Sequence, residues 1–182
     1  MKNPVQILKD TPLFKGKIAS VFKRTMAING AEVNRTVISL NKDAVMVIAL
    51  DNQENLIFVH ELAAPKGRFI NTLIKGAHDA GLSAAEVARK ELAEEAGYEP
   101  SLAKILCVLD DRPTHLDTTT TVVVLSGCFP LKEPPKGDEE AGTLKVQKVP
   151  LANVLKNPLA YFKCARTAAA LFEFKRQLNL PL

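Results

Sequence analysis

One stretch, residues 76–98, constrains this chain more than any other part of the sequence. Ser83 and Glu86 have the spacing of a capping box, which predicts a helix that begins near Ala84. The residues that follow are mostly alanine, leucine, lysine and glutamate, which favour helix. Gly97 is the expected end of this helix, because glycine readily adopts the left-handed conformation found there. The stretch therefore predicts a glycine-containing loop followed by an amphipathic helix.

Three carboxylates, Glu91, Glu94 and Glu95, lie at the end of this predicted helix. Glu91 and Glu95 are four residues apart and should share a face, with Glu94 beside them. Their mutual repulsion would be relieved by a hard cation with oxygen ligands, above all Mg²⁺. The alternative interpretation is a solvated acidic face of a surface helix. Lys90 is expected to pair with Glu94 or Glu86.

The spacing of the stretch resembles the Nudix box, G-x5-E-x7-R-E-U-x-E-E-x-G-U, where U is apolar. The positions in register are Gly76, Glu91, Leu92, Glu94, Glu95, Gly97 and, more loosely, Tyr98. The resemblance implies an α/β fold, a Nudix-type α/β/α sandwich with a mixed sheet. It also implies hydrolysis of a nucleoside diphosphate linked to another moiety.

Two box positions depart from the family pattern: Leu82 stands where the family has Glu, and Lys90 where it has Arg. In the family these two residues form a salt bridge that orients the metal-binding helix. Losing both partners together leaves no uncompensated charge, and Leu82 is expected to pack against the helix stem instead. We expect weaker positioning of the helix and retained metal binding.

The ADP-ribose pyrophosphatase and ADP compounds hydrolase subgroup is the part of the family that this chain most resembles. The similarity lies in Lys75-Gly76, in the D-x-G-x-S pattern of residues 79–83 and in the PLANVL segment, residues 150–155. Many members carry a Glu shortly before the first box glycine as an extra metal ligand. Residues 70–73, in that region here, contain none, which implies fewer metal ligands or a different arrangement.

The resemblance implies roles for the box residues. Glu91 and Glu95 would hold Mg²⁺ or Mn²⁺, with Glu94 as an additional ligand or as a group supporting the ligands. Gly76 and its loop would shape the backbone around the diphosphate. The metal would polarise phosphoryl oxygens and lower the pKa of the attacking water. The products would be AMP and a phosphorylated compound, such as ribose 5-phosphate from ADP-ribose.

The general base is expected to be a carboxylate, but the sequence leaves its identity open. Glu94 in the box is one candidate. Glu139 and Glu140, in the acidic loop of residues 132–142, are the others, because related enzymes place a catalytic Glu in this loop. A solvated loop without a catalytic role is the alternative interpretation.

His60, Arg68 and His115 are further candidates for substrate binding. His60 ends a predicted strand where related enzymes have an Arg that reaches the substrate, and Arg68 follows in a loop. His115 lies in a loop that lines the substrate cleft in the family. Each has a plain alternative: a structural histidine for His60, and solvent-exposed residues without a specific partner for Arg68 and His115.

Hydrophobic periodicity and turn signals predict the remaining elements. An Asn29-Gly30 turn indicates an N-terminal β-hairpin over residues 14–40. Further strands are expected at residues 43–50, 55–62, 101–112, 118–131 and 143–151. A final helix should begin at Asn157-Pro158. Its core-facing residues are expected to be Leu159, Phe162, Ala169 and Phe172. We divide the chain into a β extension, residues 1–40, and a hydrolase domain, residues 41–182.

Composition narrows the function classes. The net charge of +4 without a basic cluster argues against nucleic-acid binding. No apolar run is long enough for a membrane span, and no secretory signal is evident. Three widely spaced cysteines, expected as buried thiols, fit a reducing cytoplasm. In a related branch of the family the N-terminal sheet crosses to a partner subunit, so the resemblance implies a homodimer.

Two functions remain open at this stage. The first is a hydrolase that acts on ADP-ribose-like or other ADP-containing compounds, favoured by the complete carboxylate trio. The second is a catalytically weakened Nudix-fold module that binds or senses a nucleotide, favoured by Leu82, Lys90 and the missing upstream Glu.

Overall fold

A computed structural model of the chain describes residues 4–133, 135 and 144–179. The chain forms two compact units. Residues 1–43 and 110–119 make up the N-terminal unit, and residues 44–109 and 120–182 make up the sandwich unit.

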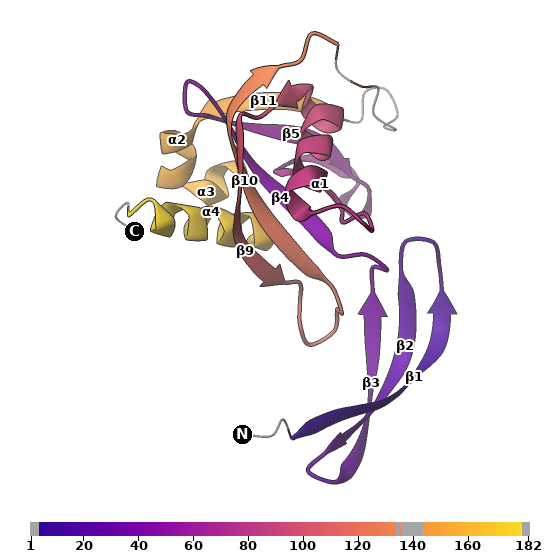
Figure 1. The fold of residues 1–182 in the computed structure, drawn as a ribbon. Coiled ribbons are helices and arrows are strands. Elements are labelled where there is room, and N and C mark those ends of the chain that lie inside the picture. The colour runs from indigo at the N-terminus through magenta and orange to yellow at the C-terminus, as the bar shows by residue number, and fades with distance from the viewer. Residues whose placement is uncertain (1–3, 134, 136–143, 180–182) are drawn as a thin grey trace. The chain divides into compact units, whose positions relative to one another are not determined.

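The N-terminal unit is a three-stranded antiparallel sheet in the order β1 (Val5–Lys15), β2 (Ser20–Ile28), β3 (Ala31–Ser39) (Figure 1). Asn29 and Gly30 join β2 to β3 with φ of 50° and 84°, as the predicted hairpin turn requires. The hairpin prediction ran one strand from residue 14 to the turn, whereas the chain reverses at residues 16–19. β1 was not predicted, and its pairing with β2 contains two register shifts.

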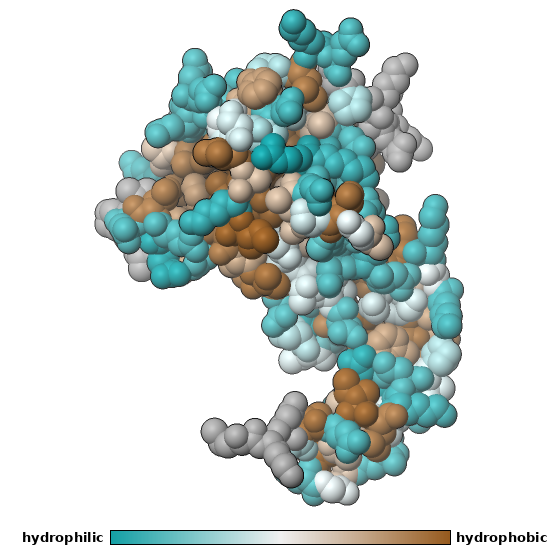
Figure 2. All heavy atoms as spheres, in the orientation of Figure 1, coloured by the Kyte–Doolittle hydropathy of each residue, from teal (hydrophilic) through white to brown (hydrophobic). Residues whose placement is uncertain are grey.

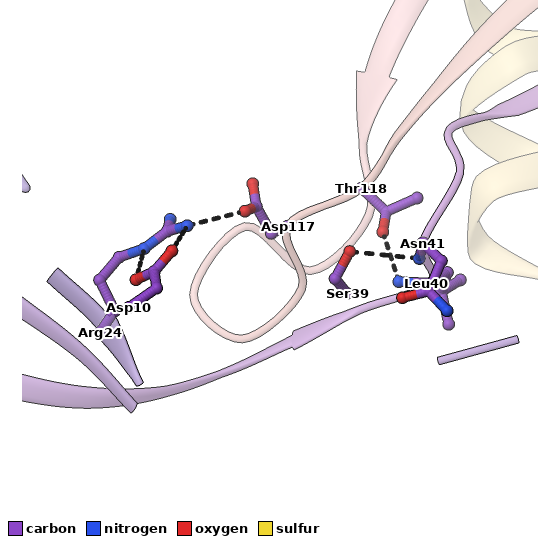
Figure 3. A network of polar contacts seen from close by, with 7 residues as sticks. All are labelled: Asp10, Arg24, Ser39, Leu40, Asn41, Asp117 and Thr118. Atoms are coloured by element: carbon purple, nitrogen blue, oxygen red, sulfur yellow. Dashed lines mark hydrogen bonds and ion pairs between the residues drawn. The ribbon is translucent and has the colours of Figure 1, made fainter. Parts of the chain in front are cut away.

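A polar network joins the loop of residues 110–119 to this sheet (Figure 3). The Arg24 guanidinium donates to both carboxylate oxygens of Asp10 at 3.0 Å and to Oδ2 of Asp117 at 2.9 Å. The Leu40 N–H donates to Thr118 Oγ1 at 3.2 Å. Hydrogen bonding to Arg24 lowers the pKa of Asp10. Charged and polar contacts therefore hold this unit together.

No described residue of β1, β2 or β3 is buried. Apolar side chains gather on this sheet in Figure 2, and several are well exposed, among them Ile7 at 55%, Leu13 at 61% and Phe14 at 60%. Within the described residues, no helix belongs to this unit. Its apolar side chains therefore have no core of their own.

The sandwich unit is built on an eight-stranded sheet. Its strands are β4 (Ala44–Asp51), β5 (Asn55–Ala63), β6 (Arg68–Thr72), β7 (Ile74–Ala77), β8 (Tyr98–Glu99), β9 (Leu102–Asp110), β10 (Thr119–Pro130) and β11 (Leu144–Pro150). The main order is β11-β5-β4-β10-β8, with β6 on β5, β7 on β4 and β9 on β10. β10 runs parallel to β4 and the other described pairs are antiparallel, so the sheet is mixed as predicted.

Helices cover both faces of this sheet (Figure 1). On one face lie α1 (Ala84–Glu91) and the π-helical turn η2 (Leu92–Ala96), and on the other α2 (Leu151–Lys156), α3 (Pro158–Tyr161) and α4 (Ala165–Gln177). A short 3-10 turn, η1 (Ala64–Lys66), follows β5. The predicted α/β/α sandwich is thus confirmed. None of the described helices has the length and apolar character needed to cross a membrane.

A helix begins at Pro158 after Asn157, as predicted, but it ends at Tyr161, and of the predicted core-facing residues Phe162 alone is buried. Phe162 is fully buried, but it has an extended backbone and separates α3 from α4. Helical spacing therefore does not continue through it, and Leu159 and Phe172 are 56% and 52% exposed. The residues that α4 buries are Thr167, Ala170, Leu171 and Phe174.

The three cysteines are free thiols, of which Cys128 is buried while Cys107 and Cys164 are half-buried. Burial raises the pKa of Cys128 to about 11. The expectation of buried thiols therefore holds fully for Cys128 alone.

Candidate active site

The centre of the site is a close approach between β7 and the end of α1. Gly76 lies in β7, opposite Val45 of β4. A Cβ atom at Gly76 would collide with the carboxylate of Glu91. Position 76 therefore has no room for a side chain, and its glycine lets the Glu91 carboxylate rest against the backbone.

The start of α1 is fixed by local hydrogen bonds, as predicted. The Glu86 N–H donates to Ser83 Oγ at 3.3 Å, and the Ser83 N–H donates to Glu86 Oε2 at 2.7 Å. Val87 and Ala88 are buried against the sheet. The capping box and this apolar contact together set the rotation of the helix that carries Glu91.

The helix changes its winding at the carboxylate cluster. The sequence predicted regular α-helix up to Gly97, whereas Leu92–Ala96 forms the π-helical turn η2. Such single wide turns occur frequently at functional sites. Gly97 ends the turn with φ of 71°, as predicted. Because Glu94 and Glu95 lie within η2, the four-residue spacing of Glu91 and Glu95 does not span a regular α-helical turn.

Glu91 is half-buried, and charged groups of both signs lie around its carboxylate. Burial raises the pKa of its carboxyl group, and the neighbouring charge of Glu94 raises it further. Lys90 and Lys75 act in the opposite direction. Ionised Glu91 is thus an oxygen donor whose charge is incompletely compensated, which suits binding of a cation.

Glu61 is linked to Glu91 through Lys75 and was not among the predicted site residues. Its carboxylate accepts hydrogen bonds from Lys75 Nζ at 2.6 and 2.7 Å and from Thr72 Oγ1 at 3.0 Å. Ile57 and Val59 of the same strand pack in the core on the α1 side. Side chains of a strand alternate between its two faces, so Ile57, Val59 and Glu61, at successive intervals of two residues, share one face. This alternation could have placed Glu61 on the α1 side from the sequence.

His60 follows the other face of β5, where Phe58 packs in the core on the α2–α4 side. Its Nδ1 is 2.8 Å from Asn71 Oδ1, and its ring stacks on Phe69 at 5.5 Å between centroids. Asn71 in turn donates to the Tyr161 carbonyl at 3.1 Å. The structure does not bring His60 together with Glu91.

The remaining predicted site residues are Arg68, His115, Glu139 and Glu140. Arg68 is exposed at the start of β6. His115 belongs to the N-terminal unit, where its carbonyl accepts the Ile38 N–H at 2.9 Å. Glu139 and Glu140 lie outside the described residues.

Both departures from the box pattern behave differently from the expectation. Leu82 is 39% exposed, so its side chain is not buried against the helix stem. Lys90 forms its ion pair with Asp79, whose Oδ2 lies 2.9 Å from the Lys90 Nζ, and Glu94 acts on Lys90 through its charge alone. Glu86 is already held by the Ser83 cap. Asp79 precedes the helix in the loop and was not considered as a partner from sequence.

The donors at this site fit a hard divalent cation. Over the ranges 4–133, 135 and 144–179, no three His, Cys, Asp or Glu side chains are gathered into a preformed metal cluster. Mg²⁺ does not require one, because it keeps several waters and uses one or two carboxylates with the substrate phosphates. The Glu91 carboxylate against Gly76, with Glu94 close by, supplies oxygen donors of that kind.

Comparison with known proteins defines the class. The family model described as NUDIX domain matches residues 40–168. The chain therefore belongs to the Nudix family. It is a Nudix pyrophosphohydrolase that acts on nucleoside diphosphate compounds, in the ADP-ribose pyrophosphatase-like subgroup.

Two similar proteins are both described as ADP compounds hydrolases. ADP compounds hydrolase NudE of Escherichia coli (strain K12) is 31% identical over 142 residues, which cover 76% of this chain and 73% of that protein. A solved structure, described as the crystal structure of ADP compounds hydrolase, matches with a TM-score of 0.81 and 25% identity. That match covers 97% of this chain and 95% of the other.

Proposed function

We propose that this protein hydrolyses ADP-ribose or another ADP-linked diphosphate, with Mg²⁺ or Mn²⁺, to AMP and a phosphorylated product. The observation that carries this proposal is the seat for the Glu91 carboxylate at the side-chain-free position Gly76. The similarity to ADP compounds hydrolase NudE supports the choice of substrate class.

Each box carboxylate has a proposed role. Glu91 and Glu95 hold the cation, and Glu94 is a further ligand or supports the ligands. When bound, the cation polarises a phosphoryl oxygen and lowers the pKa of the attacking water. Glu94, Glu139 or Glu140 takes the proton from that water. The loop that begins at Gly76 shapes the backbone around the diphosphate, while the Glu91 carboxylate occupies the space beside Gly76 itself.

The structural surroundings of Arg68 and His60 support different roles for these two residues. Arg68 is exposed and free of the neighbouring core, which supports a phosphate contact. The bond of His60 to Asn71 and its stacking on Phe69 support a structural role instead. We keep His115 as a candidate nucleotide contact.

The N-terminal extension, residues 1–40, is proposed as a dimerisation element of a homodimer, and residues 41–182 as the hydrolase domain. Support comes from the exposed apolar side chains of β1 and from the absence of buried residues among the described part of its sheet. A second subunit would cover such a surface. The three free cysteines support a reducing compartment, the cytoplasm.

A turnover panel tests the proposed function. ADP-ribose, NADH, diadenosine polyphosphates and nucleotide sugars are incubated with Mg²⁺ or Mn²⁺, and release of AMP is measured. We expect turnover of at least one ADP-linked compound. Glu91→Gln and Glu95→Gln should each lower kcat by about 100-fold or more, since a bound cation supplies several kcal/mol of transition-state stabilisation.

Glu32→Gln, at an exposed position in β3, is the matched control and should retain activity. Full metal-dependent activity in Glu91→Gln and Glu95→Gln would contradict the assigned roles. Tight binding of the panel compounds without any turnover would favour the nucleotide-binding module.

A further inference from the structure

The loop before α1 is tied to the far end of that helix by one ion pair. Lys90 Nζ lies 2.9 Å from Asp79 Oδ2, eleven residues away. Asp79 itself sits in a turn, because its carbonyl accepts the Leu82 N–H at 3.3 Å. The pair therefore connects the turn that leads into the helix with the residue directly before Glu91.

The two charges of this pair act on the box carboxylates. Asp79 contributes to raising the pKa of Glu91, and Lys90 to lowering it. Lys90 also interacts favourably with Glu94, which helps to raise the Lys90 pKa. The pair is thus part of the electrostatic environment of Glu91 and Glu94.

The loop is held at three points along its length. Gly76 at its start lies against the Glu91 carboxylate, and Ser83 at its end caps α1. The Asp79–Lys90 pair holds the segment between them. Arg89, the other cation in this turn, donates to the Pro100 carbonyl at 2.9 Å and is therefore directed elsewhere.

We propose that Asp79 and Lys90 are positioning residues that replace the salt bridge missing from this box, and that they fix the loop and the Glu91 carboxylate for catalysis. Position 82 brings no charge, since it is an exposed leucine. The bridge is formed instead from a residue three positions earlier. The inference rests on the proposed hydrolase function.

Both partners are partly exposed, with side-chain exposures of 43% for Lys90 and 32% for Asp79. Pairs of this kind add little to folding stability. An effect on the placement of Glu91 should therefore appear in kcat and in metal affinity, while the melting temperature stays close to that of the wild type.

The test uses Asp79→Asn, Lys90→Gln, the double variant and Lys90→Arg in the full-length protein. The kcat and KM for the best panel substrate are measured, and Mn²⁺ affinity is measured separately by calorimetry without substrate. We expect each single variant to lower kcat by about tenfold, with KM within about twofold, because small displacements of reacting groups are costly. Mn²⁺ affinity should fall by about tenfold, because the Glu91 carboxylate is then held less firmly.

The double variant shows whether Asp79 and Lys90 act together as one pair or as two independent residues. The double variant should resemble either single variant, because the interaction is lost only once. Lys90→Arg should stay within about twofold of the wild type, since it keeps the charge for Asp79. Glu173→Gln, which breaks the exposed Glu173–Arg176 pair on α4, is the control and should change nothing.

Wild-type kcat and Mn²⁺ affinity in both single variants would overturn the proposal, and so would additive losses in the double variant. If the wild type turns over no panel compound, the proposed function fails, yet Mn²⁺ affinity still decides the pair. A non-additive loss of Mn²⁺ affinity in the variants would support the positioning role of the Asp79–Lys90 pair. Unchanged Mn²⁺ affinity in the variants would overturn that role.

Discussion

The N-terminal unit and the sandwich unit use similar residues in different ways. β1, β2 and β3 contain many apolar residues, none of which is buried, and their sheet is held by backbone pairing and by the Arg24 network. In the sandwich unit the sheet is covered on both faces, and its apolar residues form two cores. The difference teaches that the candidate active site lies in the sandwich unit, where tight packing holds the Glu91 carboxylate in place.

Two glycines offer the sharpest contrast between the units. Gly76→Ala should lower kcat by about 100-fold, because the added methyl group must displace Glu91 from its seat. Gly30→Ala, in the β2–β3 turn, meets open space but has φ of 84°. It should cost about 1 kcal/mol of stability with little effect on the kcat of the folded protein.

Steady-state kinetics and thermal unfolding of both variants check this contrast. A Gly76→Ala protein with wild-type kcat would show that the approach of Glu91 to β7 is not needed for activity.

Leucine truncations compare the packing of the two units. Leu171→Ala in α4 removes a fully buried side chain and should destabilise the protein by about 2–5 kcal/mol. Leu13→Ala in β1 removes one that is 61% exposed and should cost at most about 0.5 kcal/mol in an isolated subunit. Denaturant unfolding measures both values at several protein concentrations.

The dependence on protein concentration tests whether β1 takes part in subunit association. If the homodimer forms through β1, the cost of Leu13→Ala should grow with protein concentration, because the substitution then weakens subunit association. Equal costs for Leu13→Ala and Leu171→Ala at every concentration would contradict the comparison.

Carboxyl groups in the two units should respond to pH with opposite signs. The pKa of Asp10 lies below its ordinary value of 3.8, so its pair with Arg24 stabilises the protein above that pH and is lost as the pH falls through the lowered pKa. The pKa of Glu91 lies above its ordinary value of 4.5. Its ionisation therefore opposes folding at neutral pH and not below pH 4.5.

Asp10→Asn should accordingly destabilise the protein at pH 7, by no more than about 1 kcal/mol. Glu91→Gln should stabilise the metal-free protein at pH 7, and both differences should shrink toward pH 3. Melting temperatures across this range, with chelator present, check the signs. A Glu91→Gln variant less stable than the wild type at pH 7 would contradict the inference that the ionised Glu91 carboxylate opposes folding.

Much of the sandwich unit could be predicted because its signals are local. The strands of residues 44–51 and 55–63 are continuous or alternating apolar runs, and the Ser83 cap needs only residues within one turn. The first N-terminal strand, β1, was missed because Pro12 and two register shifts disturb its pattern. The end of the helix at Tyr161 was missed because the extended backbone at Phe162 breaks a spacing that looks continuous in sequence.

The sequence by itself determined the Nudix box, its carboxylates, the start of the helix and the glycine that ends it, since each depends on residues a few positions apart. Tertiary structure alone decided that Gly76 faces Glu91, that Lys90 pairs with Asp79 and that Glu61 accepts hydrogen bonds from Lys75. These contacts join residues brought together by strand pairing and helix docking. Spacing along the chain does not encode which of several nearby charges a folded loop will present.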